Sequence, residues 1–310
     1  MQSKHSVAYC CGMNSIIPNT VNLHSLIPCN YSCGFCYAAF TASARGRIPQ
    51  TELHEIIQQI ADAPLPQGLR RRKVTFAGGE PLLCPTAIED IEFARECGLV
   101  TSLVTNGSLL TEDKLERLSK CLDWLVVSID SLSHQGNLKI GRSSKGNTLR
   151  VEDYLNILNT ARLLGISTKV NTVVNRVNAV EDFVDFMREA CPERWKVLQA
   201  CRIEGENSID FSAWAITEDE FEAFKTRHST LAGTGVEVVY ESDSMIYGSY
   251  AMVAPNGCFF DNSTGEYRYS RPITEVGIEA AFREISFSWE TFRERGGDYD
   301  YSKGQKEVSQ

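Results

Sequence analysis

The sequence predicts an α/β protein, a partial barrel of six strand–helix units followed by an irregular C-terminal cap. Two observations support this prediction. From residue 22 onward, short β-rich runs alternate with amphipathic helical segments, and beyond residue 201 this alternation stops. A chain of 310 residues, 43% of them hydrophobic, is also large enough to build one barrel domain.

The strands and helices of the barrel follow one another along the first 201 residues. The strand candidates are short and rich in Val, Leu and Thr, and they lie at residues 20–26, 73–77, 100–105, 124–129, 168–174 and 195–200. The helix candidates repeat apolar residues every three or four positions, at residues 52–61, 87–97, 111–118, 151–164 and 180–190. Gly98 and Gly165 directly follow two of these helices, as residues that end helices do, and Thr111 begins another.

The pattern after residue 201 predicts a cap on the open barrel. We expect a helix near residues 217–231, a strand near residues 236–240 and short strands around Tyr250 and Phe259, separated by turns rich in Gly and Asn. The chain therefore divides into an N-terminal extension (residues 1–19), the barrel (20–201), the cap (202–301) and a polar, frayed tail (302–310).

The charge and hydropathy of the chain exclude several classes of partner. The formal net charge is −9, whereas a nucleic-acid-binding surface needs clustered positive charge to replace the phosphate counterions. No apolar run approaches the roughly 20 residues that cross a bilayer, and the first 14 residues lack the order of a signal peptide. We expect a cytoplasmic protein that binds neither nucleic acid nor a membrane directly.

Three cysteines close together in the sequence predict a metal cluster. Cys29, Cys33 and Cys36 follow the first strand with the spacing C-x₃-C-x₂-C, while the other eight cysteines are scattered. Three thiolates can bind three irons of a [4Fe–4S] cubane and leave the fourth iron open for an outside ligand. A structural zinc site is the alternative, but it needs a fourth ligand and usually pairs two cysteine arms. An electron-transfer ferredoxin would need a fourth cysteine nearby.

A second motif lies at the end of the second strand. Gly78 and Gly79 allow a backbone to approach a ligand closely, and Glu80 can accept hydrogen bonds from an ammonium group. Asn106 follows the third strand and Ser128 lies in the fourth, at the carboxyl ends where barrel enzymes place their reactive groups. By itself each residue could be an ordinary turn or strand residue; together they predict a site.

With these motifs the sequence resembles the radical S-adenosylmethionine (SAM) superfamily, whose cluster loop has this cysteine spacing and an aromatic residue, here Phe35, before the last cysteine. The resemblance implies that the open iron binds the methionyl part of SAM, and that one electron cleaves the cofactor to a 5′-deoxyadenosyl radical. It also implies that the cofactor is held by the residues Tyr37, Gly78, Gly79, Glu80, Asn106, Ser128 and Arg142.

The resemblance narrows to viperin and its microbial relatives. The matching stretches occur in order at residues 29–36, 105–108, 130–131, 140–142, 169–171, 174–178, 194–199, 203–207 and 295–299. Viperin-like enzymes convert a ribonucleoside triphosphate to its 3′-deoxy-3′,4′-didehydro form, a chain terminator in antiviral defence. The resemblance implies such a substrate, with CTP as the first expectation and UTP or GTP as alternatives, and an external one-electron reductant of the flavodoxin or ferredoxin type.

A triphosphate needs cations inside a protein whose net charge is negative. Lys73 begins the second strand, and alternation along two later strands puts Lys169 with Asn171, and Arg194 with Lys196, on one face. A cation that points into a barrel is expensive unless an anion meets it. We therefore expect these four cations to hold the phosphates. The resemblance adds Asn22 and Asn171 as ribose or base contacts and Tyr250 as a proton or hydrogen donor.

Three departures from the family and two alternatives qualify this hypothesis. Ala77 stands where animal viperins have a phosphate-binding serine, and the family's tail lysine has no clear counterpart, although Arg268 or Arg271 could replace it. The chain also lacks the amphipathic N-terminal helix of animal viperins.

The first alternative is a peptide-modifying radical enzyme, which often carries extra clusters, yet only Cys258 follows Cys201. The second is a non-catalytic iron–sulfur sensor, which would need neither the glycine motif nor the cations.

Overall fold

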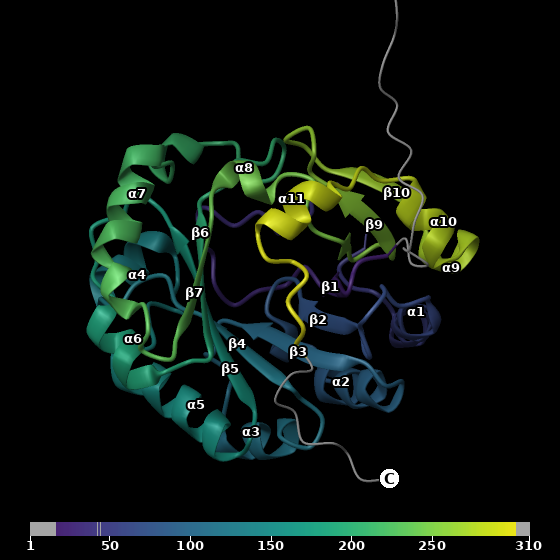
Figure 1. Ribbon diagram of the computed structural model, residues 1–310, viewed down its shortest axis with the longest axis horizontal. Coiled ribbons are helices and arrows are strands. Elements are labelled where there is room, and N and C mark those ends of the chain that lie inside the picture. The colour runs from purple at the N-terminus through teal and green to yellow at the C-terminus, as the bar shows by residue number, and fades with distance from the viewer. Residues whose placement is uncertain (1–16, 42, 44, 302–310) are drawn as a thin grey trace, which may run out of the picture.

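The computed structural model describes residues 17–41, 43 and 45–301, and its strands form one curved sheet (Figure 1). The strands are β1 (Thr20–His24), β2 (Lys73–Ala77), β3 (Val100–Thr105), β4 (Trp124–Ser128), β5 (Ser167–Val174), β6 (Arg194–Gln199), β7 (Glu237–Glu241), β8 (Met252–Val253), β9 (Cys258–Asp261) and β10 (Arg268–Pro272). Their order in the sheet is β10-β9-β8-β1-β2-β3-β4-β5-β6-β7. The predicted α/β fold with a mostly parallel sheet is confirmed.

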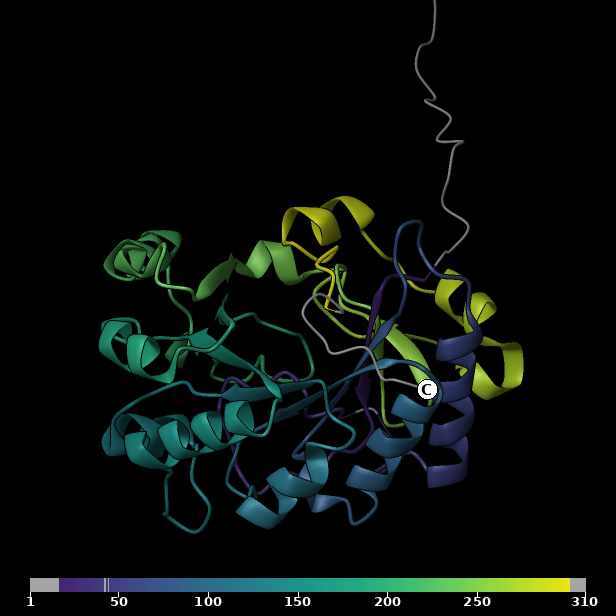
Figure 2. The same cartoon turned by 60° about the horizontal axis from the view of Figure 1, so that its bottom comes forward.

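Most helices cover the convex side of this sheet (Figure 2). The helices are α1 (Gln50–Asp62), α2 (Ala87–Glu96), α3 (Glu112–Leu118), α4 (His134–Ile140), α5 (Val151–Leu163), α6 (Val184–Ala190), α7 (Glu218–Arg227), α8 (Asp243–Ile246), α9 (Ile273–Val276), α10 (Ile278–Arg283) and α11 (Trp289–Glu294), with short 3₁₀ turns at Pro81–Leu83, Phe211–Ala213 and Ser229–Leu231. Helices α8 and α11 differ from the others, because Ile246 and Phe292 line the cavity inside the barrel. No helix within the described residues is long and apolar enough to cross a membrane.

The hydrophobic core lies between the sheet and these outer helices. Helix α1 shows why: Leu53, Ile56, Ile57 and Ile60 lie on one face of the helix and are buried in the core. Along the strands, residues facing the helices alternate with residues facing the concave side of the sheet. In β5, for example, Val170 belongs to the core, while its neighbours Lys169 and Asn171 line the cavity described below. The barrel interior therefore collects polar side chains.

The strand near residue 240 lies in a different place from the one expected. We predicted it within the cap, but β7 pairs in parallel with β6 and extends the barrel sheet to seven consecutive parallel strands. At the other edge, β8 pairs in parallel with β1. Segments of the predicted cap thus complete both edges of the barrel, because pairing of a strand with a distant partner leaves no mark on local periodicity.

Two further features of the fold bear on the site. Helix α4 was not predicted, since its two large apolar residues, Leu138 and Ile140, are two positions apart and give no helical period; Ser133 caps its start and Gly141 ends it with φ of 89°. The last described segment crosses the starts of several strands, where the Trp124 indole donates to the Tyr301 carbonyl at 3.1 Å and Asn19 donates to the Tyr299 carbonyl at 3.2 Å. Residues 1–16 and 302–310 of the predicted extension and tail lie outside the described residues.

Candidate active site

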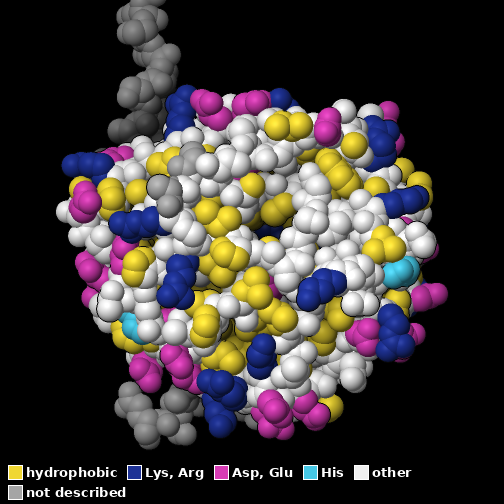
Figure 3. Space-filling model, turned by 180° about the vertical axis from the view of Figure 1, so that it is seen from behind, with side chains coloured by type: hydrophobic (Ala, Val, Ile, Leu, Met, Phe, Trp, Pro, Cys, Tyr) yellow, Lys and Arg dark blue, Asp and Glu magenta, His cyan; other side chains and the backbone are white. Residues whose placement is uncertain are grey.

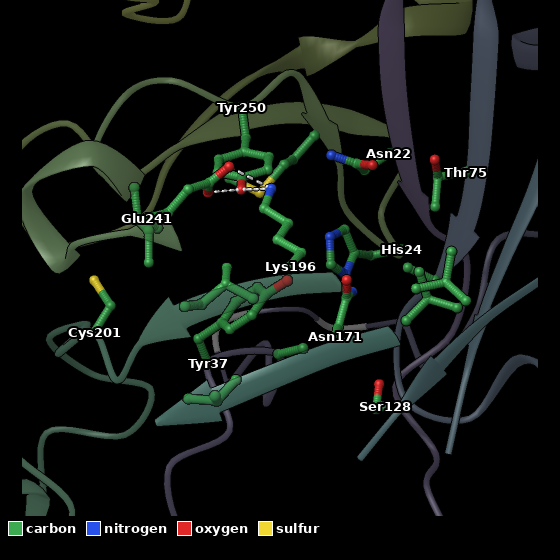
Figure 4. Close-up of a pocket in the computed structure, with 18 of the residues that line it drawn as sticks. Asn22, His24, Tyr37, Thr75, Ser128, Asn171, Lys196, Cys201, Glu241 and Tyr250 are labelled. Carbon is green, nitrogen blue, oxygen red and sulfur yellow. Dashed lines mark hydrogen bonds and ion pairs between the residues drawn. The ribbon is translucent and has the colours of Figure 1, made fainter. Parts of the chain in front are cut away.

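One cavity runs through the barrel, and nearly every predicted site residue lines it. The lining residues among those predicted are Cys29, Cys33, Cys36, Tyr37, Gly78, Gly79, Asn106, Ser128, Arg142, Asn22, Lys73, Lys169, Asn171, Arg194, Lys196 and Tyr250. Figure 4 shows several of them pointing toward a common space. The face of the molecule opposite the C-terminal segment is hollowed near its centre (Figure 3). Glu80 is the exception among the predicted residues.

The cysteine loop is fixed by the end of helix α4. Ser32 N–H donates to the Gly141 carbonyl and Gly34 N–H donates to the Ile140 carbonyl, both at 3.0 Å. Within the loop, Cys36 N–H donates to the Cys33 carbonyl at 3.0 Å. A Cβ at Gly141 would lie 2.2 Å from the Ser32 carbonyl oxygen, so only glycine allows this close approach. The unpredicted helix therefore positions the metal-binding segment.

The three sulfurs lie among donors that suit thiolates bound to a cluster. Tyr31 N–H lies 3.4 Å from the Cys29 sulfur, and Arg142 Nη1 lies 3.8 Å from the Cys33 sulfur. Burial raises the pKa of Cys33 to about 12. Bound iron would lower this pKa again, because it stabilises the thiolate. In a cubane each thiolate binds its own iron, so three cysteines of one loop suit a cluster with one open iron, whereas a closed zinc site needs a fourth ligand.

The two glycines of the second motif bring their loop against the segment that leads into Cys29. Gly79 N–H donates to the Leu26 carbonyl at 2.8 Å, and Glu80 N–H donates to the Pro28 carbonyl at 2.9 Å. A Cβ on Gly79 would lie 2.0 Å from the Pro28 oxygen, and Gly78 has φ of 133°. The close approach that we expected between the glycines and a ligand is thus also an approach to the protein's own backbone.

Glu80 lies behind the cavity wall. Its carboxylate accepts hydrogen bonds from the Thr105 hydroxyl and the Asn106 N–H, each at 2.8 Å, and from Leu82 N–H at 3.1 Å. Burial raises its pKa, while these donors oppose the rise. In this structure Glu80 therefore positions Asn106, whose side-chain amide donates to Asn30 at 2.8 Å.

Arg142 and Ser128 lie at the same end of the barrel as the cysteines. Arg142 is buried; it forms a salt bridge with Asp130 at 2.8 Å and donates to the Ser128 carbonyl at 2.6 Å. Burial acts to lower the pKa of Arg142, but Asp130 outweighs it and raises the pKa. Its Nε is buried without a partner among the described residues. Such an unpaired donor beside the cysteine loop fits a carboxylate of a bound ligand.

The predicted cations gather at the opposite end, because Lys73 and Arg194 are the first residues of β2 and β6. Lys169 pairs in register with Arg194, and Asn171 with Lys196, which confirms that each strand presents its two polar residues to one face. Within the described part of the chain, Lys73 and Lys169 have no carboxylate partner, and Lys73 contacts the Tyr301 ring at 3.3 Å. Burial, and then the neighbouring cations, lower the pKa of both lysines well below the usual value.

Several cavity residues escaped the sequence interpretation, and three of them bear directly on the chemistry of the site. Glu241, the last residue of β7, is fully buried and pairs with Lys196 at 2.6 Å and with Arg295 at 3.4 Å. The Tyr250 hydroxyl donates to the same carboxylate and accepts from Lys196, as the dashed lines in Figure 4 show. Arg295 stood in a matching stretch without an assigned role, and nothing in the local pattern marked Glu241.

The third is His24, which points into the cavity from β1 among aromatic rings. Burial lowers its pKa to about 4, so it is neutral at pH 7, and its Nδ1 has no partner in the described structure. Along the same wall, further polar atoms are buried without partners, namely Thr20 Oγ1, Thr75 Oγ1, Ser102 Oγ and Asn171 Oδ1. Buried polar groups are normally paired, so this wall is suited to a polar ligand.

Comparisons with known proteins agree with these features. Residues 28–190 match the model of the radical SAM superfamily. The chain is 38% identical to an S-adenosylmethionine-dependent nucleotide dehydratase of Flammeovirga pacifica, over 93% of this chain and 97% of the relative. It is 40% identical to a protein of the same name from Lacinutrix mariniflava, over 94% of this chain but only 60% of that longer relative.

Solved structures confirm the fold. "Native anSMEcpe with bound AdoMet" superimposes with a TM-score of 0.63 at 14% identity, over 89% of this chain and 82% of that chain. Streptococcus suis SuiB bound to S-adenosylmethionine gives 0.60 at 18% identity, over 78% and 59%. The cysteine loop, the superfamily match and the nucleotide-dehydratase relatives all confirm the predicted kinship. The chain belongs to the radical SAM superfamily and, within it, to the family of S-adenosylmethionine-dependent nucleotide dehydratases.

Proposed function

We propose that this chain converts a ribonucleoside triphosphate to its 3′-deoxy-3′,4′-didehydro form with loss of water. The observation that carries the proposal is the arrangement of the cavity, with three cysteines at one end and, at the other, two buried lysines, Lys73 and Lys169, that have no carboxylate partner in the described part of the chain. Six cationic side chains and two carboxylates line the cavity, an excess of four positive charges when all are ionised. A nucleoside triphosphate carries about four negative charges, so it matches this excess.

The residues divide into a cofactor end and a substrate end. At the cofactor end, Cys29, Cys33 and Cys36 would hold a [4Fe–4S] cluster, and Arg142 and Asn106 would hold SAM. When bound, these groups supply the 5′-deoxyadenosyl radical that removes the ribose 4′ hydrogen. An external one-electron carrier of the flavodoxin or ferredoxin type would reduce the cluster.

At the substrate end, the chain's own side chains bind and orient the nucleotide. Lys73, Lys169 and Arg194 meet the phosphates, because their charges lie together without enough carboxylates to balance them. Asn22 and Asn171 project from β1 and β5 between the two ends, where a ribose linking base and phosphates would lie. Tyr250 faces this middle region and would donate a proton or hydrogen as the 3′-hydroxyl leaves. The barrel (20–201) would thus supply most ligands and the cap (202–301) the donor.

CTP is the expected substrate, with UTP and GTP as alternatives. Ala77 stands where animal viperins have a phosphate-binding serine. The hydroxyls of Thr75 and Ser102, which line the same cavity, take over this role as hydrogen-bond donors to phosphate. Arg271 pairs with Glu284 at 2.5 Å outside the cavity, so Arg295 is the better candidate for the missing tail cation. A product without a 3′-hydroxyl cannot be extended by a polymerase, which is the basis for a proposed role in antiviral defence.

The test uses full-length protein reconstituted with iron and sulfide and reduced without oxygen. CTP, UTP, GTP, ATP and the nucleoside cytidine are each incubated with SAM, and mass spectrometry follows 5′-deoxyadenosine and a nucleotide that has lost water. We expect one triphosphate to give both products and cytidine to give neither above background. Cofactor cleavage without loss of water from any triphosphate would contradict the proposal and favour a peptide substrate; absence of cofactor cleavage would favour a sensor.

A further inference from the structure

The last residue of β7 carries a carboxylate that the proposed reaction has not yet used. The lining of the cavity contains two carboxylates, Asp130 and Glu241, and Asp130 is paired with Arg142 at the cofactor end. Glu241 lies at the substrate side, and its side chain is 1% exposed. A buried carboxylate is costly unless charged or hydrogen-bonding partners surround it. The identity of those partners therefore indicates its purpose.

Three donors from three separate segments converge on this carboxylate. Lys196 Nζ on β6 lies 2.6 Å from Oε1, and Arg295 Nη1, after α11, lies 3.4 Å from the same oxygen. The Tyr250 hydroxyl, just before β8, donates to Oε2. Lys196 also donates to the Tyr250 oxygen, so lysine, tyrosine and carboxylate form a closed triangle (Figure 4). Each member restricts the other two.

Arg295 holds the triangle from its outer side. Its guanidinium carbon lies 3.7 Å from the centre of the Tyr250 ring, and its Nη2 donates to the Ser249 carbonyl at 2.6 Å. The ring and the backbone before it are therefore fixed, and the phenol has its C–O rotation as the remaining freedom. The hydroxyl hydrogen can turn from Glu241 toward the cavity while the lysine stays in contact with the oxygen.

We propose that Glu241 is a positioning residue that keeps Lys196 protonated against Tyr250, so that the lysine–tyrosine pair delivers the proton with which the ribose 3′-hydroxyl leaves as water. This inference rests on the proposed function. The phenolic O–H bond breaks as an O–H bond of water forms, and a Lys196 N–H bond breaks as the phenol regains its proton. The lysine then takes a proton from solvent, and the external reductant supplies the single electron that completes the reaction.

The charges around Lys196 give the direction in which Glu241 acts. Burial lowers the pKa of Lys196 to about 8, with Arg295 and Arg194 acting in the same sense and Glu241 opposing them. Burial acts to raise the pKa of Glu241 itself, but Lys196 and Arg295 hold it below its usual range, so the carboxylate stays ionised. The remaining titratable groups facing this region are Lys73, Lys169, Tyr37 and Tyr301, in addition to Tyr250.

Removing the carboxylate should therefore make Lys196 lose its proton at lower pH. The measured quantity is didehydro nucleotide formed per 5′-deoxyadenosine, because this ratio cancels the effect of pH on cluster reduction. In the unmodified enzyme the ratio should fall as pH rises through about 8. In Glu241→Gln the fall should move down by about one to two pH units, which lowers the ratio about five- to fiftyfold at pH 8 and at most about twofold at pH 6.

Two variants serve as controls and one as a second test. Glu241→Asp keeps the negative charge, so its pH profile should move to lower pH by less than that of Glu241→Gln. Glu284→Gln removes a carboxylate that also binds an arginine, Arg271, but lies outside the cavity, and it should leave the profile unchanged. If Glu241→Gln does not fold, Lys196→Arg provides the test. A guanidinium stays charged over this pH range but is too weak an acid to reprotonate the phenol, so the ratio should be lower than in the unmodified enzyme at pH 6 and the fall near pH 8 should vanish.

The outcomes separate the inference from the function on which it rests. If the unmodified enzyme makes no dehydrated nucleotide, the proposed function fails. If it does, but Glu241→Gln shows an unchanged profile, or Lys196→Arg keeps the fall near pH 8, the positioning role is overturned. A uniform loss at all pH values with a matching rise in KM would likewise overturn it, since that result indicates general damage to binding.

Discussion

Lys169 offers the sharpest test of the substrate end, because it is a buried cation without a carboxylate partner in the described structure. We predict that Lys169→Met weakens nucleotide binding and does not destabilise the protein without nucleotide. A charge-assisted hydrogen bond to phosphate is worth about 1.5–3 kcal/mol, which corresponds to about a ten- to hundredfold rise in Kd. Without nucleotide, replacing an unbalanced buried charge by an apolar chain of similar length should be neutral or stabilising.

Proton linkage adds a second signature to the same variant. Burial and the neighbouring cations lower the pKa of Lys169 well below its usual value, and a bound phosphate would raise it again. The lysine therefore takes up a proton when the nucleotide binds over the pH range between its two pKa values. Binding should be tightest below the pKa of the free protein and should weaken as pH rises toward the pKa of the complex.

Isothermal titration of CTP into the protein at several pH values, with thermal unfolding of the free protein, measures both effects. Lys120→Met is the matched control, since Lys120 is exposed and outside the cavity. We expect Lys169→Met to bind more weakly, to show a smaller pH dependence of Kd and to keep or raise the melting temperature. Unchanged affinity together with unchanged proton uptake would refute the assignment of Lys169 to the phosphates.

Three other predictions concern the cluster, its loop and the donor. Cys33→Ala should lose the [4Fe–4S] cluster and SAM cleavage, and a variant that kept four irons and normal cleavage would contradict the cluster assignment. Gly79→Ala places a Cβ 2.0 Å from the Pro28 oxygen, so the loop before Cys29 must shift. We expect the free energy of unfolding, measured by denaturation, to fall by about 1–3 kcal/mol, and iron analysis to find less bound iron. Tyr250→Phe should still move deuterium from the ribose 4′ position into 5′-deoxyadenosine but make less product per cofactor cleaved, with little change in KM; full coupling would leave Tyr250 as packing only.

Much of this protein could be predicted from local sequence. The alternation of strands and helices follows from hydrophobic periodicity, which each segment carries by itself. The three cysteines are close in sequence, so their shared role needs no tertiary information, and the in-register pairing of Lys169 with Arg194 and of Asn171 with Lys196 agrees with strand alternation. These features depend on neighbours within a few residues along the chain or on a strand's period of two.

Only the tertiary structure decided what depends on contacts between distant segments. It moved the strand ending at Glu241 from the cap to the barrel edge, and so brought this carboxylate against Lys196, Tyr250 and Arg295. It also showed that Glu80 bonds to Asn106 behind the cavity wall and that a short helix before Gly141 holds the cysteine loop. The physical reason is the same in each case. A buried charge or a close backbone approach is determined by partners on other strands, helices and loops, and the hydrophobic periodicity of a single segment carries no information about them.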